Sequence, residues 1–330
     1  MTNILYTVAT DKNGQLIKAN DAEKGADFLC PVCKSELILR KSGKTGKGTK
    51  RPHFAHRALT PNCTPETALH YAFKNLLADK LQKHIATQTP LPFSWYCEFC
   101  GGQHSGNLLK KVKDVKIEYN LTVCKPDIAL LEENEKVFGV IEIVVSHKPE
   151  ENTLKYYNDK NIILIQINLT SDKDIDELHN RISQPNKVGT CFNPKCKTCG
   201  HFQSKKIMTI IDGPCWKCHS TMKVATISTS SGSMVRGSSN HLRPSDFMPD
   251  EIAFAKSKNV ILKNQYSNTV DESYVASSCG RCGSFAGDFY LFTQYITPAG
   301  RGELPSQTFD IGYHCDYCNN KSENRNDDFE

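Results

Sequence analysis

The chain has 330 residues, of which 38% are hydrophobic and 23% are charged. This length predicts two or three domains, and the composition excludes a chain that is mostly disordered. The longest strongly apolar run, Val137–Val145, is interrupted by Glu142, so we expect no membrane-spanning helix and no membrane partner. The first residues carry neither the basic nor the apolar part of a secretory signal.

The cysteines are the most informative residues. Twelve of the 15 form six C-x-x-C pairs, at residues 30/33, 97/100, 196/199, 215/218, 279/282 and 315/318. Two thiolates at this spacing can reach one tetrahedral zinc ion, whereas structural disulfides do not favour a two-residue gap. We therefore expect a cytoplasmic protein with about three to four structural zinc ions.

The charge is distributed unevenly. Residues 1–114 carry 17 Lys and Arg against nine Asp and Glu, a net charge of +8. Residues 115–190 carry nine against 13, a net of −4, and residues 191–330 carry 15 against 14. This pattern favours an N-terminal region that binds a polyanion, next to a middle region whose carboxylates hold a metal. The alternative for the basic region is ordinary solvated charge.

Residues 1–63 are predicted to form a zinc finger with a basic region. Cys30 and Cys33 are followed after 19 residues by His53 and His56. Two thiolates and two imidazoles close a structural zinc site without water. A glycine-spaced basic hairpin, residues 40–51, lies between the two pairs. The alternative is a redox-active or free thiol pair beside surface histidines.

Residues 64–85 are predicted to form one helix. Thr64 is a suitable N-cap and Pro65 fits the first helical position. The apolar stripe consists of Leu69, Phe73, Leu77 and Leu81, and the polar residues near it are Glu66, His70, Lys74 and His84. A carboxylate and imidazoles on the core side must be paired or bound to a metal, although a first-turn carboxylate can also turn to solvent.

Cys97 and Cys100 form a knuckle with His104 as a third zinc ligand. No fourth ligand follows locally. Four residues remain open for that position, namely Cys63, Cys124, Cys191 and His201.

The middle of the chain is predicted to be a mixed α/β layer. Residues 115–123 alternate as a half-buried strand, and two apolar strands then flank the polar turn 132–136. A symmetric hairpin pairs positions whose numbers sum to about 269, which places Asp127 opposite Glu142 and Lys125 opposite Val144. A helix over 150–160, a strand over 161–167 and a helix over 172–183 follow.

Asp127 and Glu142 both lie in apolar strands. Two carboxylates in such a place can bind Mg²⁺ or Mn²⁺, and the ion can then activate a water and polarise a phosphodiester. The alternative is two solvent-facing carboxylates on an amphipathic hairpin. Glu142 argues against it, because the surrounding residues are typical of a strand that is buried on both faces.

Residues 191–320 are predicted to form zinc ribbons that are too small to bury a core of their own. The eight cysteines there make two four-thiolate sites, and their pairing is open: Cys196, Cys199, Cys215, Cys218, Cys279, Cys282, Cys315 and Cys318. Five aromatic residues can stack on bases or pack the ribbons, namely Trp216, Phe285, Phe289, Tyr290 and Phe292. Residues 228–239 are predicted to be an exposed loop, and residues 321–330 a disordered tail.

Several of these motifs together resemble the competence protein CoiA-like family. They are C-x2-C followed by H-F-A-H, then E-x3-H-x3-K at Glu66, His70 and Lys74, then K-P-D and I-E-I-V-V-S-H, within residues 25–170. The resemblance implies a PD-(D/E)XK nuclease fold over residues 64–190 and a role in processing DNA during competence or recombination. It also implies that Asp127 and Glu142 bind the metal, that Glu66 is a third carboxylate, and that His70 and Lys74 reach the substrate.

Position 144 departs from the superfamily, which has Lys there, whereas CoiA-like proteins often have Gln and this chain has Val. We hypothesise that Lys125 supplies the missing ammonium, with Lys74 as a second source. The sequence thus predicts a metal-dependent deoxyribonuclease that uses Mg²⁺ or Mn²⁺, with single- or double-stranded DNA left open. A DNA-binding or recombination accessory protein without catalysis is the alternative, and a protein–protein scaffold is a third.

Overall fold

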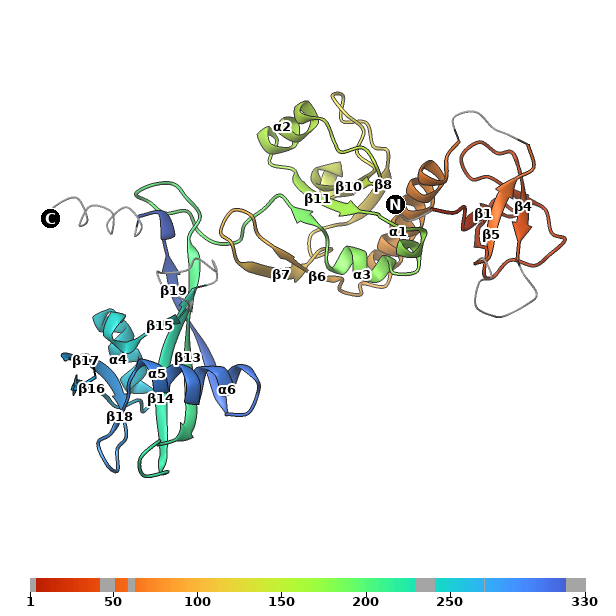
Figure 1. Ribbon diagram of the computed structural model, residues 1–330. Coiled ribbons are helices and arrows are strands. Elements are labelled where there is room, and N and C mark those ends of the chain that lie inside the picture. The colour runs from red at the N-terminus through yellow and green to blue at the C-terminus, as the bar shows by residue number, and fades with distance from the viewer. Residues whose placement is uncertain (1–3, 42–50, 59–62, 230–240, 270, 319–330) are drawn as a thin grey trace. The chain divides into compact units, whose positions relative to one another are not determined.

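The computed structural model describes residues 4–41, 51–58, 63–229, 241–269 and 271–318. The basic segment 42–50, most of the expected loop at 228–239 and the expected tail lie outside these residues. The chain divides into two compact units (Figure 1). The first consists of residues 1–96 and 104–190, and the second of residues 97–103 and 191–330.

The first unit begins with a small antiparallel sheet of five short strands in the order β2-β1-β3-β4-β5. Their bounds are β1 Val8–Thr10, β2 Leu16–Lys18, β3 Phe28–Leu29, β4 Glu36–Arg40 and β5 His53–His56. Phe28, Leu37 and Phe54 are buried in its core together with Cys30. This core is small, so a metal ion bound at its edge would add to the stability of the sheet.

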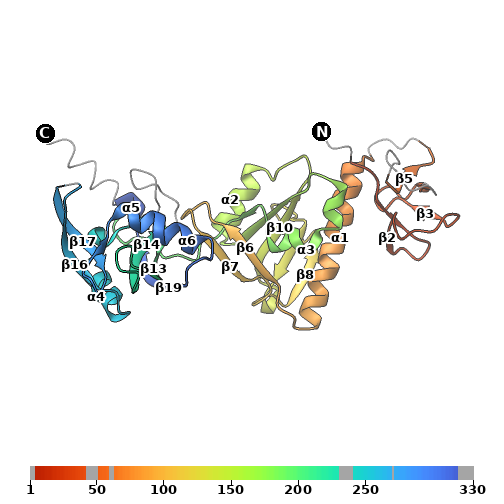
Figure 2. The ribbon, with the colours of Figure 1, turned by 60° about the horizontal axis from the view of Figure 1, so that its bottom comes forward.

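The helix α1 spans Pro65–Ala86, as the sequence predicts. Thr64 caps it, because its hydroxyl accepts a hydrogen bond from the Thr67 main-chain N–H at 3.2 Å. The predicted stripe of Leu69, Phe73, Leu77 and Leu81 is buried. The helix runs beside two strands of the central sheet, β8 (Asp114–Ile117) and β10 (Val137–Val144) (Figure 2).

The central sheet of the first unit has five strands in the order β12-β11-β10-β9-β8. Their bounds are β8 Asp114–Ile117, β9 Ile128–Leu131, β10 Val137–Val144, β11 Ile163–Asn168 and β12 Lys187–Val188. β10 and β11 are parallel and the other pairs are antiparallel, so the sheet is mixed. The pairing of Ile141 with Ile128 and of Val140 with Ala129 has the predicted register.

Helical segments flank this sheet where the sequence predicts them. α2 is Glu151–Asp159, and the predicted helix at 172–183 is split into the 3-10 turn η2 (Asp172–Ile175) and α3 (Leu178–Ser183). The turn between β9 and β10 holds a further 3-10 segment, η1 (Glu133–Glu135). The strand predicted over 115–123 ends at Ile117, because Glu118 has a φ of +50° that breaks the extended backbone.

A two-stranded ribbon, β6 (Pro92–Tyr96) and β7 (Gln103–Asn107), carries the Cys97 knuckle at its turn. Phe93 and Trp95 stack on each other within β6, with ring centroids 4.8 Å apart. The indole N–H of Trp95 donates a hydrogen bond to the Thr190 carbonyl at 3.3 Å. This ribbon is therefore tied to the last residue of the first unit.

The second unit is larger than the predicted ribbons. A four-stranded sheet in the order β15-β14-β13-β19 is accompanied by a three-stranded sheet in the order β16-β17-β18. The strands are β13 Ser204–Pro214, β14 Thr221–Thr229, β15 His241–Leu242, β16 Leu262–Ser267, β17 Glu272–Ser278, β18 Phe285–Ala286 and β19 Ser306–His314. The helical segments are η3 Pro244–Asp246, α4 Pro249–Ser257, α5 Asp288–Tyr290, η4 Leu291–Ile296 and α6 Thr297–Gly300.

This unit buries a core, which corrects the expectation that the region is too small to have one. One buried cluster contains Met208, Ile210, Ile227 and Phe247, and another contains Val224, Leu291 and Tyr295. The reason is that β13 and β14 are 11 and nine residues long and contribute apolar side chains to both clusters, Met208 and Ile227 to the first and Ile211 and Val224 to the second. Among the described residues, no helix is long and apolar enough to cross a membrane.

Candidate functional site

A cluster of charged side chains lies in the first unit, where α1 meets the start of β9. Asp127 immediately precedes β9, and three groups converge on its carboxylate. His70 Nε2 lies 3.0 Å from Oδ2, and the Ile143 main-chain N–H donates a hydrogen bond to the same oxygen at 2.9 Å. Lys74 Nζ donates to Oδ1 at 3.4 Å. Asp127 is thus held by one helix and one neighbouring strand.

Lys74 is a buried cation between two carboxylates. Its side chain is 6% exposed, and its ammonium lies 2.6 Å from Glu118 Oε1 as well as near Asp127. The hydrogen bond and positive charge of Lys74 hold the pKa of Glu118 below its ordinary value. A buried ammonium needs such partners, because desolvation otherwise favours its neutral form. Lys74 is therefore positioned by two carboxylates, with its ammonium beside Asp127.

The environment of Asp127 favours its ionised form. Burial alone would raise its pKa, but the hydrogen bond and charge of His70, the Ile143 N–H and the charge of Lys74 together hold the pKa below its ordinary value. The groups around Asp127 all donate hydrogen bonds to its carboxylate, which is the arrangement that stabilises a negative charge inside a protein.

Glu142, on β10, has the opposite character. Burial and, to a smaller extent, the negative charge of Asp127 raise its pKa to about 7, although the hydrogen bond from Tyr157 acts in the opposite direction. The Tyr157 hydroxyl donates that bond to Oε1 at 2.6 Å, and Tyr157 itself is 1% exposed on α2. Burial and the neighbouring Glu142 raise the pKa of Tyr157 well above its usual range. Two carboxylates with pKa values pushed apart are typical of functional sites.

The structure brings together four of the residues that the sequence analysis selected: His70, Lys74, Asp127 and Glu142. Val144 is 7% exposed and offers no polar group. Glu118 and Tyr157 were not predicted. The kink at Glu118 gives no sequence signal, whereas Tyr157 could have been noticed as one of two tyrosines in an otherwise polar helix.

Glu66 does not join this cluster. It is exposed in the first turn of α1, before Ala68, the first buried residue of the helix. Among the described residues, the groups that could hold a metal include no set containing Glu66, Asp127 and Glu142. Glu66 therefore stays a candidate from the resemblance alone, while Asp127 and Glu142 are the carboxylates that this cluster contains.

Lys125 also lies apart from its expected position. It is exposed, and the hairpin ladder ends at the pair of Ile128 and Ile141, so it does not extend to Val144. The ladder stops there because the Ile143 N–H bonds to the side chain of Asp127. Lys74, the second source considered from the sequence, is the ammonium that reaches Asp127.

Four groups of cysteine and histidine side chains could hold zinc. Within each group the ligand atoms lie within 4.8 Å of one another, and the groups are Cys30/Cys33/His56/Cys63, Cys97/Cys100/His104/Cys191, Cys196/Cys199/Cys315/Cys318 and Cys215/Cys218/Cys279/Cys282. Four S or N donors of this kind suit a closed tetrahedral site. Zinc–sulfur bonds of about 2.3 Å imply sulfur–sulfur distances of about 3.8 Å.

The N-terminal group differs from the predicted one in a single ligand. Cys33 Sγ lies 3.2 Å from His56 Nε2, and Cys30 Sγ lies 3.5 Å from Cys63 Sγ. His53 is not part of the group, because its Nδ1 is 2.8 Å from the Arg51 carbonyl and β5 places alternate side chains on opposite faces. Cys63, just before α1, takes the fourth place.

The other pairings resolve the alternatives that the sequence leaves open. Cys191 is the residue that joins Cys97, Cys100 and His104. In the second unit, Sγ–Sγ distances are 3.8 Å for Cys196–Cys318 and 3.4 Å for Cys199–Cys315. They are 3.6 Å for Cys215–Cys282 and 3.7 Å for Cys218–Cys279. These distances fit tetrahedral zinc.

Five of the C-x-x-C pairs share one local backbone. In each, the residue four positions after the first cysteine has a positive φ and donates its N–H to the carbonyl of that cysteine, namely Lys34, Gly101, Gly200, His219 and Gly283. The first cysteine in turn donates its own N–H to the carbonyl of the residue five positions later. This turn orients both thiols toward one point, which explains why the two-residue gap recurs.

The fold and these groups define a mixed α/β protein with several sheets and with cysteine and histidine clusters that could bind metal. Residues 11–65 match the family model described as competence protein CoiA, N-terminal domain. The match supports the similarity to the CoiA-like family and suggests a function related to competence. The chain matches no curated protein and no solved structure.

Proposed function

We propose that the first unit is a divalent-metal-dependent deoxyribonuclease with a PD-(D/E)XK-like core, in which Asp127 and Glu142 hold Mg²⁺ or Mn²⁺. The observation that carries this proposal is the pair of half-buried carboxylates with opposite pKa shifts, flanked by a buried ammonium and an imidazole. Such a concentration of partly buried charge is unfavourable for stability alone. It is the arrangement expected where charge has to be handled during a reaction.

The donor set fits a hard divalent cation. Asp127 and Glu142 offer carboxylate oxygens, the ligands that Mg²⁺ and Mn²⁺ prefer, and no thiol or imidazole is needed. The negative charge of Asp127 contributes to raising the pKa of Glu142, so a cation between them would relieve this repulsion. When bound, the ion would supply a water of lowered pKa and polarise the scissile phosphate.

Lys74 would supply the positive charge near the phosphate that Val144 cannot supply. Its ammonium is fixed beside Asp127 and can offset the negative charge that develops on the phosphate. His70 would keep Asp127 ionised and oriented through its 3.0 Å contact. Tyr157 would orient Glu142 in the same way. In this mechanism α1 supplies Lys74 and His70 and α2 supplies Tyr157, whereas the two carboxylates come from the sheet and the residue before it.

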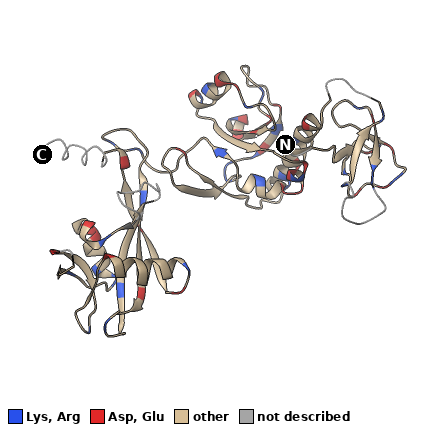
Figure 3. Ribbon diagram, in the orientation of Figure 1, with Lys and Arg blue, Asp and Glu red and all other residues tan. Residues whose placement is uncertain are grey.

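DNA is the proposed substrate for two reasons. The match of residues 11–65 is to a domain of a competence protein, and residues 1–114 carry an excess of eight positive charges. Elsewhere the charges are interspersed, as along α2, where Glu151, Lys155 and Asp159 alternate in sign (Figure 3). Phosphate contacts are therefore expected mainly from the N-terminal region. The zinc clusters would keep these parts folded.

Cleavage of labelled single- and double-stranded DNA by zinc-loaded protein with Mn²⁺ or Mg²⁺ tests the proposal. Asp127→Asn and Glu142→Gln should each reduce the rate by at least about 100-fold. Lys74→Met should reduce it comparably, whereas Lys125→Met, the matched change of an exposed lysine, should leave it unchanged. Glu66→Gln should also be neutral. Equal loss in the Lys74 and Lys125 variants would contradict the assigned role of Lys74.

A DNA-binding accessory protein without cleavage is the second candidate, and Val144 is the residue that favours it. Such a protein would bind DNA with an affinity that falls steeply with added salt. Its binding would be the same in the wild type and in Asp127→Asn, with or without Mn²⁺. No cleavage of any substrate, combined with this binding, would replace the nuclease proposal by the accessory one.

A further inference from the structure

A large pocket lies in the second unit, beside the Cys215/Cys218/Cys279/Cys282 group. Its volume is about 1040 Å³, which is at the upper end of the range of about 300–1,000 Å³ that is usual for small-molecule sites. It is lined by the hairpin of β16 and β17, by η3, and by the segment from β18 to α5, with Trp216 from the Cys215 knuckle. The size suits a segment of several residues.

One end of the pocket is an aromatic shelf. Trp216 and Tyr290 are stacked, with ring centroids 5.0 Å apart and planes at 10°, and Phe289 meets Tyr290 edge-on. Trp216 is 42% exposed and Phe289 72% exposed. The Trp216 N–H donates to the Phe285 carbonyl at 2.9 Å, which fixes the ring orientation while an aromatic surface remains accessible. Packing alone does not require such exposure.

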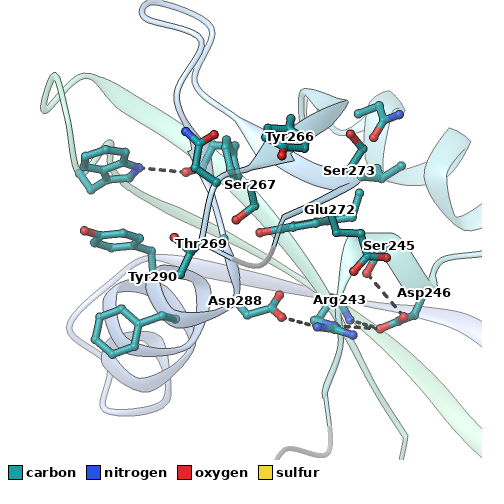
Figure 4. A pocket seen from close by; sticks show the side chains of 18 residues that line it. Arg243, Ser245, Asp246, Tyr266, Ser267, Thr269, Glu272, Ser273, Asp288 and Tyr290 are labelled. Atoms are coloured by element: carbon teal, nitrogen blue, oxygen red, sulfur yellow. Dashed lines mark hydrogen bonds and ion pairs between the residues drawn. The ribbon is translucent and has the colours of Figure 1, made fainter.

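The charge of the pocket is negative. Arg243 is the single basic residue among the lining residues, and it is paired with both Asp246 and Asp288 (Figure 4). Glu272 also lines the pocket; its main chain pairs with Ser267, and its carboxylate has no hydrogen-bond or ion-pair partner among the described residues. Three carboxylates therefore face one cation that is already engaged. The remaining polar groups are neutral, being mainly serine, threonine and asparagine side chains.

This chemistry disfavours nucleic acid. Single-strand-binding surfaces combine stacking aromatics with a positively charged groove that follows the phosphates. Here the aromatics are present, but no free cation is found among the described lining residues. A guanidinium or ammonium group is attracted both by aromatic faces and by an unpaired carboxylate. The pocket is thus complementary to positive charge.

The hairpin adds an argument about the shape of the ligand. β16 is at the edge of the three-stranded sheet, with β17 on one side and no other described strand on the other. Asn264, Tyr266 and Ser267 of β16 line the pocket. An edge strand offers main-chain donors and acceptors to an extended peptide.

We propose that this pocket binds an extended, positively charged peptide segment of a protein partner, with Trp216 and Tyr290 receiving a cationic side chain and Glu272 pairing with another. The proposal does not depend on the nuclease, because every lining residue belongs to the second unit.

Selection from a display library of random ten-residue peptides on the full zinc-loaded chain tests it without knowledge of the partner. Peptides retained by the wild type should be enriched in Lys and Arg at least about threefold over the unselected library. The enrichment should disappear with Glu272→Gln and with Tyr266→Ala. Tyr266 is an exposed residue of the hairpin and is not adjacent to a zinc ligand in the sequence. Glu303→Gln, the same charge change outside the pocket, should leave the enrichment intact.

A selected peptide then allows a quantitative test. Replacing its arginines by citrulline, which is neutral but of similar shape, should weaken binding about tenfold, as should Trp216→Ala in a protein with unchanged zinc content. The proposal is overturned if no enrichment occurs, if citrulline and arginine peptides bind equally, or if the Tyr266 and Glu272 variants select the same peptides. It is also overturned if a single-stranded oligonucleotide binds the wild type and loses binding in Trp216→Ala.

Discussion

The central sheet of the first unit and the long sheet of the second unit are held together in different ways. In the first, Ile128, Leu130, Ile141 and Ile165 are at most 1% exposed, and none of the four cysteine and histidine groups lies on these strands. In the second, β13 and β14 contribute buried side chains to two separate apolar clusters, and groups of four cysteines lie at the ends of the strands. One sheet depends on apolar burial and the other on burial together with metal.

This difference separates the proposed reaction from the structural metals. The carboxylate cluster is supported by a core that contains no thiol ligand, so zinc removal should not disturb it directly. The peptide pocket, in contrast, is lined by residues next to the zinc ligands. Trp216 lies between Cys215 and Cys218, and Phe285 follows shortly after Cys282. Its shape should therefore depend on bound zinc.

Zinc removal should have the largest effect. Structural zinc sites contribute about 10–16 kcal/mol in small domains, so a strong chelator or Cys215→Ser should unfold the ends of the second sheet. Hydrogen exchange should show loss of protection in β13 and β14 and retained protection in β10 and β11. Cys124→Ser, which changes a thiol outside the clusters, is the control. Equal loss of protection in both sheets would contradict the comparison.

A cavity in the central sheet should have the next largest effect. Ile141 is fully buried, so Ile141→Ala should reduce the free energy of unfolding by about 2–5 kcal/mol. Ile117→Ala, at a residue that is 38% exposed, should have a much smaller effect. Urea unfolding followed by hydrogen exchange of β10 measures both. Similar losses in the two variants would mean that this sheet does not depend on its buried core.

Stability should also change with pH through Glu142. Because its pKa in the folded chain is raised from 4.5 to about 7, its contribution to stability is complete below pH 4.5 and is lost as the pH rises through 7. Without divalent ions the loss should reach about 3 kcal/mol. Glu142→Gln should remove this dependence, and urea titrations at pH 5, 7 and 8.5 measure it. Under the proposed function, Mn²⁺ binding near pH 7 should release a proton.

The helix cap should have the smallest effect. Thr64→Ala removes the acceptor for the Thr67 N–H and should lower the free energy of unfolding of the first unit by about 1 kcal/mol. Thr64→Asp keeps an acceptor and should restore most of it. If the aspartate variant were as unstable as the alanine variant, the cap would not be the cause.

Local patterns in the sequence were sufficient to predict part of this structure. The bounds of α1 follow from the cap at Thr64 and the spacing of its leucines, and the register of β9 with β10 follows from the length of the polar turn. Asp127 and Glu142 stand out because each is a carboxylate within an apolar run. These features depend on neighbours within about 20 residues.

The remaining features depend on contacts between distant residues. Cys63 replaces His53 because the alternation of β5 and the start of α1 together decide which side chain faces Cys30. Cys196 joins Cys318 across more than a hundred residues, and spacing alone gives no preference among such partners. Lys125 was expected opposite Val144 because the hairpin was extended as a regular ladder beyond the pair of Ile128 and Ile141. Glu66 does lie in α1, but its side chain is exposed in the first turn. The core of the second unit was missed because cysteine motifs suggested small ribbons.

Cys124 is the one cysteine, among 15 that the structure describes, that lies outside the four clusters. With zinc bound to the other fourteen, Cys124 is the thiol left for a maleimide dye. Its sulfur is 3.6 Å from the hydroxyl of Tyr157, which in turn contacts Glu142. The natural chain thus offers a labelling site for a fluorescent reporter near Glu142. Metal binding to the carboxylates can then be followed without an engineered thiol.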